Sequence, residues 1–600
     1  MKKILLSLGI AGVAASALFS LSSCGDELKA YPWIIEEDGP ASADDAAFTD
    51  MDLLERQMLS ALPQMLKYFK VGESGGHGYQ YARLNSVDNY AGYWTTTKAN
   101  FMFGPALATL YTDNNGYLGG PCDNEVFSLS YAAVHYWDKA EYTVTDGNGK
   151  KSQVLQPRPE WRALALIAQG YAGHEIIDFY GCCPFTDWRN KKATMPLNYE
   201  TGPAVYKQIL ADLDEAIATL KKAQPSPEDM RRVEGIVPEK TFSGNDWRNW
   251  VKLANSIKLR MAMNMVDYVD PDPVYGPDSK PFVSQNIAEE AVADEIGVFT
   301  DADAQDFGYH LEQTNCVWYQ IGNGWNDLRL CASLENILKH FKSPLLAAWF
   351  DKSSSPIKNS SGVTGPSGIY GVRIGLMMED TGAPTSGGYG PFGQLSTRFE
   401  KMGQPYFKRT EGLMLMAEGA LRGWNMGGTA KDFYERAIRL SLKENAEYPG
   451  VTITDDEIEK YLNQDNLPAV EYRDYYNRSN DIMGRVTCGV KWNESDPNEL
   501  KLEKIITQKY IANFPMGAEA WTNFRRTGYP RLFPPVYNNM NNVDTEMQIR
   551  RLPYVANPNN AAEIAQITEL MGGTNDCGTR VFWDVNSVNW VKDDNGQYIP

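Results

Sequence analysis

Histidine is scarce in this chain, and cysteine pairs with metal-binding spacing are missing. Only 5 histidines occur among 600 residues, and no two of them have the spacing of metal ligands. The 8 cysteines include no Cys-x-x-Cys pair, which structural zinc sites commonly use. The glycine-rich stretch at 72–78 fits neither phosphate-binding loop pattern. The sequence therefore lacks the ligand spacing that is typical of a zinc site.

Positive charge is also in short supply. The chain carries 57 Lys and Arg against 76 Asp and Glu, a net charge of −19. A polyanionic surface argues against nucleic acid as a partner and against adsorption to anionic lipid headgroups. After residue 23, no segment approaches the roughly 20 apolar residues that a membrane-spanning helix needs. We therefore expect no nucleic acid partner, and any membrane link to be made by a lipid.

The first 24 residues have the features of a lipoprotein signal peptide. Lys2 and Lys3 precede an apolar run over 4–21, and Leu21-Ser-Ser-Cys24 follows directly. This last motif resembles the bacterial lipobox, in which the cysteine is acylated and becomes the first residue of the mature protein. An ordinary signal peptide with a chance cysteine nearby is the alternative. Since stable anchoring needs more than one acyl chain, the multiply acylated Cys24 that a lipobox implies would hold the chain at a membrane.

Helical periodicity dominates the remainder. Apolar residues recur at helical spacing over about 160–180, 203–222, 245–269, 404–422, 430–445 and 498–513. Helices of this length predict a mainly α fold of antiparallel pairs in the tetratricopeptide style, although no clean 34-residue repeat is present. Stretches rich in Pro, Gly, Asn and Ser, at 270–400 and 530–600, predict long irregular loops with a few short strands. The predicted organisation is a signal peptide (1–23), a lipidated acidic tether (24–45) and one helical domain with long loop insertions (46–600).

Two loop segments combine aromatic with polar side chains. Sugar rings stack their C–H faces on Trp and Tyr, and their hydroxyls need partners such as Asp, Asn and Arg. The sequence therefore predicts ligand contacts at Tyr79, Tyr81, Arg83, Asp88, Asn89, Tyr93 and Trp94 in the first segment, and at Trp318, Tyr319 and Trp325 in the second. The alternative is that these side chains pack the loops onto the helices.

An acidic loop matches part of a calcium-binding pattern. Asp301, Asp303, Gln305 and Glu312 fit some ligand positions, but Asp306 stands where the sharp turn requires glycine. A solvated acidic loop is therefore favoured over a calcium site. No cofactor is otherwise expected, and no pair of carboxylates stands out as catalytic, so the chain is not expected to be an enzyme.

Several segments match one protein family in the same order along the chain. The matching segments are 162–167, 178–187, 212–220, 250–263, 505–514 with Glu519 to Trp521, 525–530 and 550–554. The most specific is Ile-Ile-Thr-Gln-Lys-Tyr-Ile-Ala-Asn-Phe at 505–514, followed by Arg-Arg-Thr-Gly-Tyr-Pro at 525–530. Together they resemble the SusD/RagB family of Bacteroidetes outer-membrane lipoproteins. On this resemblance, Trp521, Arg525 and Arg526 are scaffold residues rather than ligand contacts.

The resemblance implies a surface-exposed outer-membrane lipoprotein that functions in nutrient uptake and polysaccharide utilisation. Its partner would be a SusC-like TonB-dependent transporter, over which it acts as a lid that captures an oligosaccharide without reacting with it. A lid that captures peptides is the nearest alternative, because peptides also use aromatic grooves. A surface glycan-degrading enzyme and a structural surface protein without ligand are alternatives from other classes.

Overall fold

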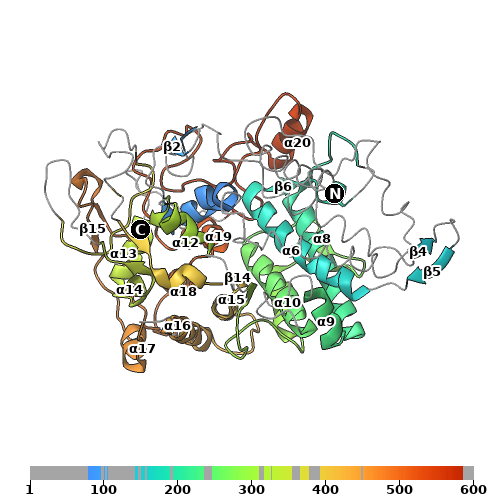
Figure 1. The fold of residues 1–600 in the computed structure, drawn as a ribbon, viewed down its shortest axis with the longest axis horizontal. Helices are drawn as coiled ribbons and strands as arrows, with labels where there is room; N and C mark the ends of the chain where they lie inside the picture. The colour runs from blue at the N-terminus through green and yellow to red at the C-terminus, as the bar shows by residue number, and fades with distance from the viewer. Residues whose placement is uncertain are drawn as a thin grey trace, which may run out of the picture.

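A computed structural model describes residues 79–95, 100–101, 104–105, 142–145, 151–155, 159–189, 193–234, 246–309, 316–325, 327–353, 365–376, 389, 392–446 and 451–585. The predicted signal peptide and tether, including Cys24, lie outside these residues. Figure 1 shows helices as the main elements, with only short strands between them. The mainly α fold class predicted from the sequence is confirmed.

The longer helices are α6 (Pro159–Tyr180), α8 (Gly202–Ala223), α10 (Trp247–Asn264), α15 (Arg409–Leu421), α16 (Ala430–Ala446), α18 (Asn498–Asn513) and α19 (Gly517–Thr527). Shorter helices are α7 (Phe185–Trp188), α9 (Pro227–Glu234), α11 (Ser284–Ala293), α12 (Val317–Tyr319), α13 (Ala332–His340), α14 (Leu345–Trp349), α17 (Asp455–Leu462) and α20 (Ala561–Met571). Two π-helical segments, η2 (Gln80–Asp88) and η3 (Gln320–Gly324), and two 3-10 turns, η4 (Thr397–Lys401) and η5 (Arg478–Asn480), complete the helical elements of the described residues.

The described strands form two-stranded antiparallel ribbons. The pairs are β1 (Trp94–Thr95) with β11 (Arg329–Leu330), β2 (Asn100–Phe101) with β3 (Gly104–Pro105), β4 (Tyr142–Thr145) with β5 (Lys151–Leu155), β6 (Cys182–Cys183) with β7 (Glu200–Thr201), β8 (Val274–Tyr275) with β9 (Lys280–Pro281), β10 (Phe307–Tyr309) with β14 (Gln404–Phe407), β12 (Phe350–Asp351) with β13 (Gln394–Leu395), and β15 (Glu471–Tyr472) with β16 (Ile482–Met483). Such ribbons connect the helices and build no larger sheet among the described residues.

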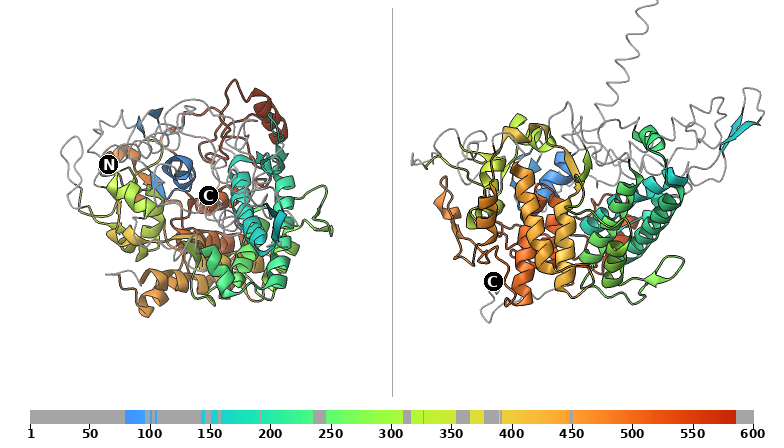
Figure 2. Two further views of the ribbon diagram at one scale, coloured as in Figure 1. Left: turned by 45° about the vertical axis from the view of Figure 1, so that its right-hand side comes forward. Right: turned by 90° about the horizontal axis from the view of Figure 1, so that it is seen from below.

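Successive long helices pack as antiparallel pairs. Arg162, near the start of α6, pairs with Glu215, in the second half of α8, at 3.1 Å. Arg409, the first residue of α15, likewise forms an ion pair with Glu444, near the end of α16. Figure 1 and the right-hand view of Figure 2 show α6, α8 and α10 side by side in one half of the molecule, with α15, α16 and α18 together in the other.

Local sequence signals explain why α8 begins and ends where it does. Thr201 caps the helix by accepting a hydrogen bond from the backbone N–H of Ala204 at 3.4 Å, and Pro203 stands in the first turn. Lys221 and Lys222 lie in the last turn, where cations oppose the negative end of the helix dipole. These features fix the helix bounds close to the predicted 203–222.

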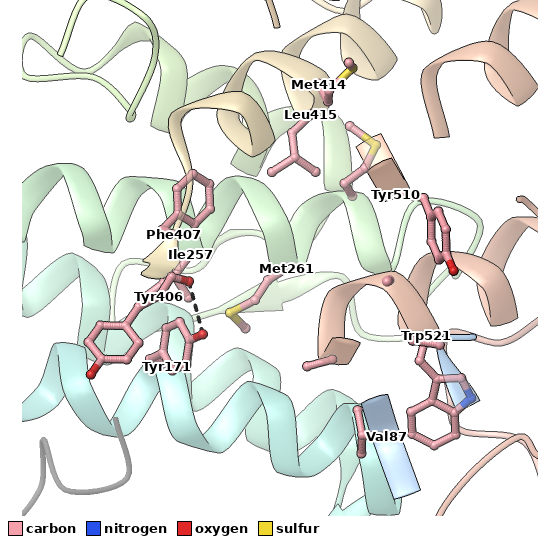
Figure 3. Packing of buried hydrophobic residues seen from close by; sticks show 14 of the residues in the cluster. Val87, Tyr171, Ile257, Met261, Tyr406, Phe407, Met414, Leu415, Tyr510 and Trp521 are labelled. Carbon is pink, nitrogen blue, oxygen red and sulfur yellow. Dashed lines mark hydrogen bonds between the residues drawn. The ribbon is translucent and has the colours of Figure 1, made fainter. Parts of the chain in front are cut away.

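One hydrophobic core joins the two groups of helices. Figure 3 shows Tyr171 of α6 beside Ile257 and Met261 of α10, with its hydroxyl donating to the backbone oxygen of Tyr406 at 3.1 Å. Trp521 of α19 is fully buried in the same cluster. Because residues from α6, α10, β14 and α19 share this cluster, the helices form a single packed scaffold.

The helix predicted over 404–422 is wrong at its start. Residues Gln404–Phe407 form β14, paired with β10 in the register Phe307 to Phe407, and the helix begins only at Arg409. Pro405 has no backbone N–H to donate, which favours an extended edge over a helix here. The predicted helix over 245–269 also ends early, at Asn264, and the stretches predicted as irregular contain α11, α13 and α20.

Candidate ligand-binding site

The two aromatic segments predicted from the sequence meet in space. The indole Nε1 of Trp318 donates to the Tyr79 hydroxyl oxygen at 3.1 Å, and the two rings pack edge to face with centroids 5.7 Å apart. Gln80 donates to the Asp327 carboxylate at 3.2 Å, and Trp94 in β1 stands opposite Leu330 in β11. Segments more than 200 residues apart thus form one structural unit.

Each of the two segments contains a π-helical stretch beside these contacts. In the first predicted cluster, Tyr81, Arg83 and Asp88 lie on η2, and Tyr93 and Trp94 follow it. The second cluster runs from α12 directly into η3 and ends at Trp325. The π-helix is rare in proteins and often marks a functional site. Two segments that each contain a π-helical stretch contact one another here. We therefore take this region of the described residues as the candidate site.

Most of the predicted ligand residues are enclosed by protein. Tyr79, Asp88, Asn89, Tyr93, Trp94 and Trp318 are all buried. The Trp94 ring lies 5.0 Å from that of Phe514, and the Tyr93 hydroxyl donates to the backbone oxygen of Tyr510. In this conformation these six side chains pack the loops onto the helices, which is the alternative to ligand binding considered above. Their role as ligand contacts stays a prediction.

Three predicted residues are only half-buried. Arg83 forms an ion pair with Glu175 of α6, and this pair links η2 to the helical scaffold. Tyr319 and Trp325 flank the η3 turn on its two sides and pack partly against the core. Among the described members of the set, these two are the aromatic side chains best placed to contact a ligand.

Sequence reasoning missed the polar residues between these two aromatics. Gln320 and Asn323 are half-buried within η3. Asn323 donates through Nδ2 to the backbone oxygen of Leu395 at 2.8 Å, while its Oδ1 is buried without a hydrogen-bond partner. A buried amide oxygen of this kind suits a hydroxyl donor on a ligand. The run Tyr-Gln-Ile-Gly-Asn-Gly-Trp, polar and small residues between two aromatics, is the signal that could have found them.

Buried charge fixes the base of the site. The Arg329 guanidinium donates to the backbone oxygens of Gly322 and Leu328 at 3.2 and 2.6 Å, which holds η3 in place. Burial lowers the pKa of Arg329 to about 10. At the other end, burial raises the pKa of the Asp88 carboxyl to about 6, despite the hydrogen bond that it accepts from Tyr79.

The acidic loop considered for calcium is paired with cations of the chain. Asp301 binds Arg436 and Asp303 binds Lys252; Glu312 lies outside the described residues. Within the described part of the chain, no group of three or more possible ligands is arranged to hold a metal ion. The six cysteines that the structure describes are buried.

Comparison with known families decides the identity of this fold. A sequence profile described as "SusD-like: Susd and RagB outer membrane lipoprotein" matches residues 42–584. The chain belongs to the SusD-like family. The family recognised from the motifs at 162–554 is therefore confirmed. No described helix of this SusD-like chain has the length and apolar character needed to cross a bilayer.

Solved SusD homologues share the fold over nearly the whole chain. A chitin-binding SusD homolog from Flavobacterium johnsoniae is 27% identical with a TM-score of 0.69, and the match covers 89% of this chain and 99% of that one. A SusD homolog from Bacteroides ovatus is also 27% identical, with a TM-score of 0.67 and 90% and 100% coverage. One from Bacteroides thetaiotaomicron is 26% identical, with a TM-score of 0.67 and 89% and 99% coverage. A comparison with curated proteins finds no match.

The family motifs of this SusD-like chain serve its scaffold. Trp521 is fully buried and donates through Nε1 to the backbone oxygen of Ile549 at 3.2 Å. Arg525 donates to the backbone oxygens of Asp178 and Arg550 at 2.6 and 2.8 Å. These contacts confirm the prediction that the C-terminal motif fixes loops through hydrogen bonds and packing.

Asp178, in the motif at the end of α6, ties together three other segments. Its Oδ1 accepts hydrogen bonds from the Tyr206 hydroxyl of α8 at 2.5 Å and from the Trp583 indole at 2.7 Å. Its Oδ2 accepts from Asn264 of α10 at 3.1 Å. Burial raises the pKa of this carboxyl to about 7, although these hydrogen bonds and the Arg525 charge oppose the shift.

Asp178→Asn should flatten the pH dependence of stability. The native pKa of about 7 lies above the unfolded value of about 3.9. Between these values the native chain holds a proton that the unfolded chain has released, so this group makes stability fall as pH rises through that window, by at most about 1.4 kcal/mol per pH unit. Asn cannot titrate, and its amide can donate to Asn264 Oδ1, which is buried without a partner. Urea unfolding at pH 5, 6 and 7 tests this; equal slopes for both proteins would contradict the assignment.

Proposed function

We propose that this SusD-like chain is a cell-surface lipoprotein of the outer membrane, anchored through Cys24, that captures oligosaccharides as the lid of a SusC-like TonB-dependent transporter. The observation that carries the proposal is the family match over residues 42–584. The chitin-binding homolog, 27% identical over 89% of this chain, supports a glycan as the ligand. The lid binds and hands over its ligand without catalysing a reaction.

The ligand would rest on the η3 turn. Tyr319 and Trp325 provide half-buried aromatic surfaces at its two ends, suited to the C–H faces of sugar rings. Gln320 and Asn323 lie between them and offer amide groups to the hydroxyls. Two aromatics with a few placed polar groups form the kind of surface that a neutral or N-acetylated oligosaccharide can use.

Alanine at Tyr319 or Trp325 should weaken glycan binding about tenfold, because a lost aromatic contact of about 1.4 kcal/mol corresponds to a factor of ten. The mature chain with Cys24→Ser is titrated by calorimetry with chitin oligosaccharides first, then with other glycans and with peptides. Phe582→Ala is the matched control. This half-buried ring packs on Tyr206 of α8, in the other half of the molecule.

Each outcome of this titration decides one part of the proposal. Glycan affinity unchanged in both site variants would overturn the η3 site. Binding of peptides alone, or of no glycan, would overturn the glycan ligand. Release of shorter sugars by the purified protein, detected by mass spectrometry, would overturn the non-catalytic assignment.

Association with a transporter needs a separate test. The lipidated full-length chain, purified from its native membrane in mild detergent, should bring a TonB-dependent transporter with it. The Tyr319→Ala variant should retain that association while binding glycan less tightly. Purification without a transporter would count against the lid.

A further inference from the structure

A buried chain of hydrogen bonds runs beneath the candidate site. The Trp318 indole donates to the Tyr79 oxygen at 3.1 Å, and the Tyr79 hydroxyl donates to Asp88 Oδ2 at 2.5 Å. All three side chains are buried. Since Trp318 immediately precedes Tyr319 in α12, this chain of bonds ends at the residue next to a proposed ligand contact.

The other end of this chain is fixed to the scaffold. Asp88 lies against Gly517, the first residue of α19, so closely that a Cβ on Gly517 would overlap the Asp88 carboxylate. Arg83, one turn earlier on η2, is held by Glu175 of α6. Asp88 therefore has little freedom to move, and its hydrogen bond holds the Tyr79 hydroxyl in a fixed position.

We infer that Tyr79 and Asp88 are positioning residues that hold the α12–η3 segment in its binding conformation, and that this hold requires Asp88 in its ionised form. The inference rests on the proposed glycan site at Tyr319 and Trp325. It adds a regulatory property to that site, namely that the affinity for ligand depends on pH.

The reason lies in the direction of the hydrogen bonds. An ionised carboxylate only accepts, so the Tyr79 hydroxyl must donate to it and presents its own oxygen to the Trp318 N–H. A protonated Asp88 can instead donate to the Tyr79 oxygen, where it competes with Trp318. The chain of hydrogen bonds from Trp318 through Tyr79 to Asp88, which we call the relay, then has two arrangements in place of one. The α12–η3 segment is consequently held less firmly.

The neighbours of Asp88 set the pH at which this happens. Burial is the largest influence and raises the pKa to about 6, and Glu175 of α6 acts in the same direction. The hydrogen bond from Tyr79 and the charge of Arg83 on η2 oppose it. On α19 the nearest carboxylate, Glu519, is neutralised by Lys509 at 2.7 Å. Above pH 6 the relay is therefore in its single arrangement, and acidification through pH 6 releases it.

The test measures affinity for a chitin oligosaccharide between pH 5 and 7.5. If only the ionised form binds, affinity at pH 5 should be about tenfold weaker than at pH 7.5, because about one molecule in eleven is then competent. Asp88→Asn accepts the Tyr79 bond but cannot titrate, so its affinity should not change with pH. Tyr79→Phe should bind more weakly, with a flat profile. Tyr434→Phe is the control: it removes the buried hydrogen bond from the Tyr434 hydroxyl of α16 to the backbone oxygen of Val490. This variant should keep the wild-type pH profile.

A second measurement does not depend on any ligand. Hydrogen exchange of the amides in 317–325, corrected for the intrinsic effect of pH, should speed up at pH 5 in the wild type and not in Asp88→Asn. Wild-type affinity and exchange that are both independent of pH would overturn the relay, as would a pH profile that survives in Asp88→Asn. Absence of glycan binding together with the expected exchange pattern would overturn the proposed function and leave the positioning role established.

Discussion

Glu418→Gln should lower the free energy of unfolding by about 3 kcal/mol, because it removes one partner of a buried ion pair. The Arg526 guanidinium binds both Glu418 oxygens, at 2.6 and 2.8 Å, and the two side chains are 1% and 0% exposed. Burial alone would raise the pKa of Glu418, but the charges of Arg526 and Arg422 lower it to about 2. A guanidinium cannot shed its proton in a protein, so the variant leaves a buried, poorly compensated charge between α15 and α19.

An exposed pair provides the matched control. Glu459 of α17 binds Arg439 of α16, with the two side chains 51% and 38% exposed, and exposed pairs contribute about 0–1 kcal/mol. Urea unfolding at pH 7 should therefore separate Glu418→Gln from Glu459→Gln by at least about 2 kcal/mol. Similar losses in the two variants would mean that the Arg526 pair is solvated in solution.

The same pair predicts how acid affects the fold. The pKa of Glu418 in the native chain, about 2, lies below its unfolded value of about 4.3. The stabilisation from its ionised form is therefore complete above the unfolded value and is lost as pH falls toward 2. This acts opposite to Asp178, whose contribution falls as pH rises, so the two groups favour an intermediate pH for the native state.

Sequence periodicity was sufficient where a helix is specified by its own residues. The stretch around 160–180 contains apolar residues at helical spacing after Pro159, and α6 spans Pro159–Tyr180. The first turn of the predicted helix over 404–422 failed because β14 is specified by its partner β10, about 100 residues earlier in the chain. Pairing over that distance leaves no periodic signal in the local sequence.

Composition indicated the two segments of the candidate site but could not distinguish their buried residues from those exposed to a ligand. Aromatic residues near polar ones correctly marked two segments that meet, yet Trp94 and Tyr319 look equivalent in sequence. Burial separates them, and burial of Trp94 depends on Phe350 and Phe514, which are far away along the chain.

Gly412→Ala should destabilise the protein by about 3 kcal/mol or more, although Ala in place of Gly within a helix normally stabilises by up to about 1 kcal/mol. A Cβ on Gly412 of α15 would overlap the backbone oxygen of Phe299. That backbone cannot easily retreat, because the Phe299 N–H is held by the Ser256 hydroxyl of α10 at 3.1 Å. The overlap would therefore push α15 away from α10.

The neighbouring residue amplifies the expected loss. Glu411 binds Arg260 of α10 through two hydrogen bonds of 2.7 and 2.9 Å, both side chains being buried, so separation of the helices would stretch this ion pair as well. Gly573→Ala is the control, since its added Cβ meets only the Thr579 side chain at ordinary contact distance, and its effect should stay within about 0.5 kcal/mol. Unfolding by urea and by heat distinguishes the two variants. A Gly412→Ala protein as stable as the wild type would show that α15 and α10 lie farther apart in solution, and that the scaffold beneath the η3 site is looser than this packing requires.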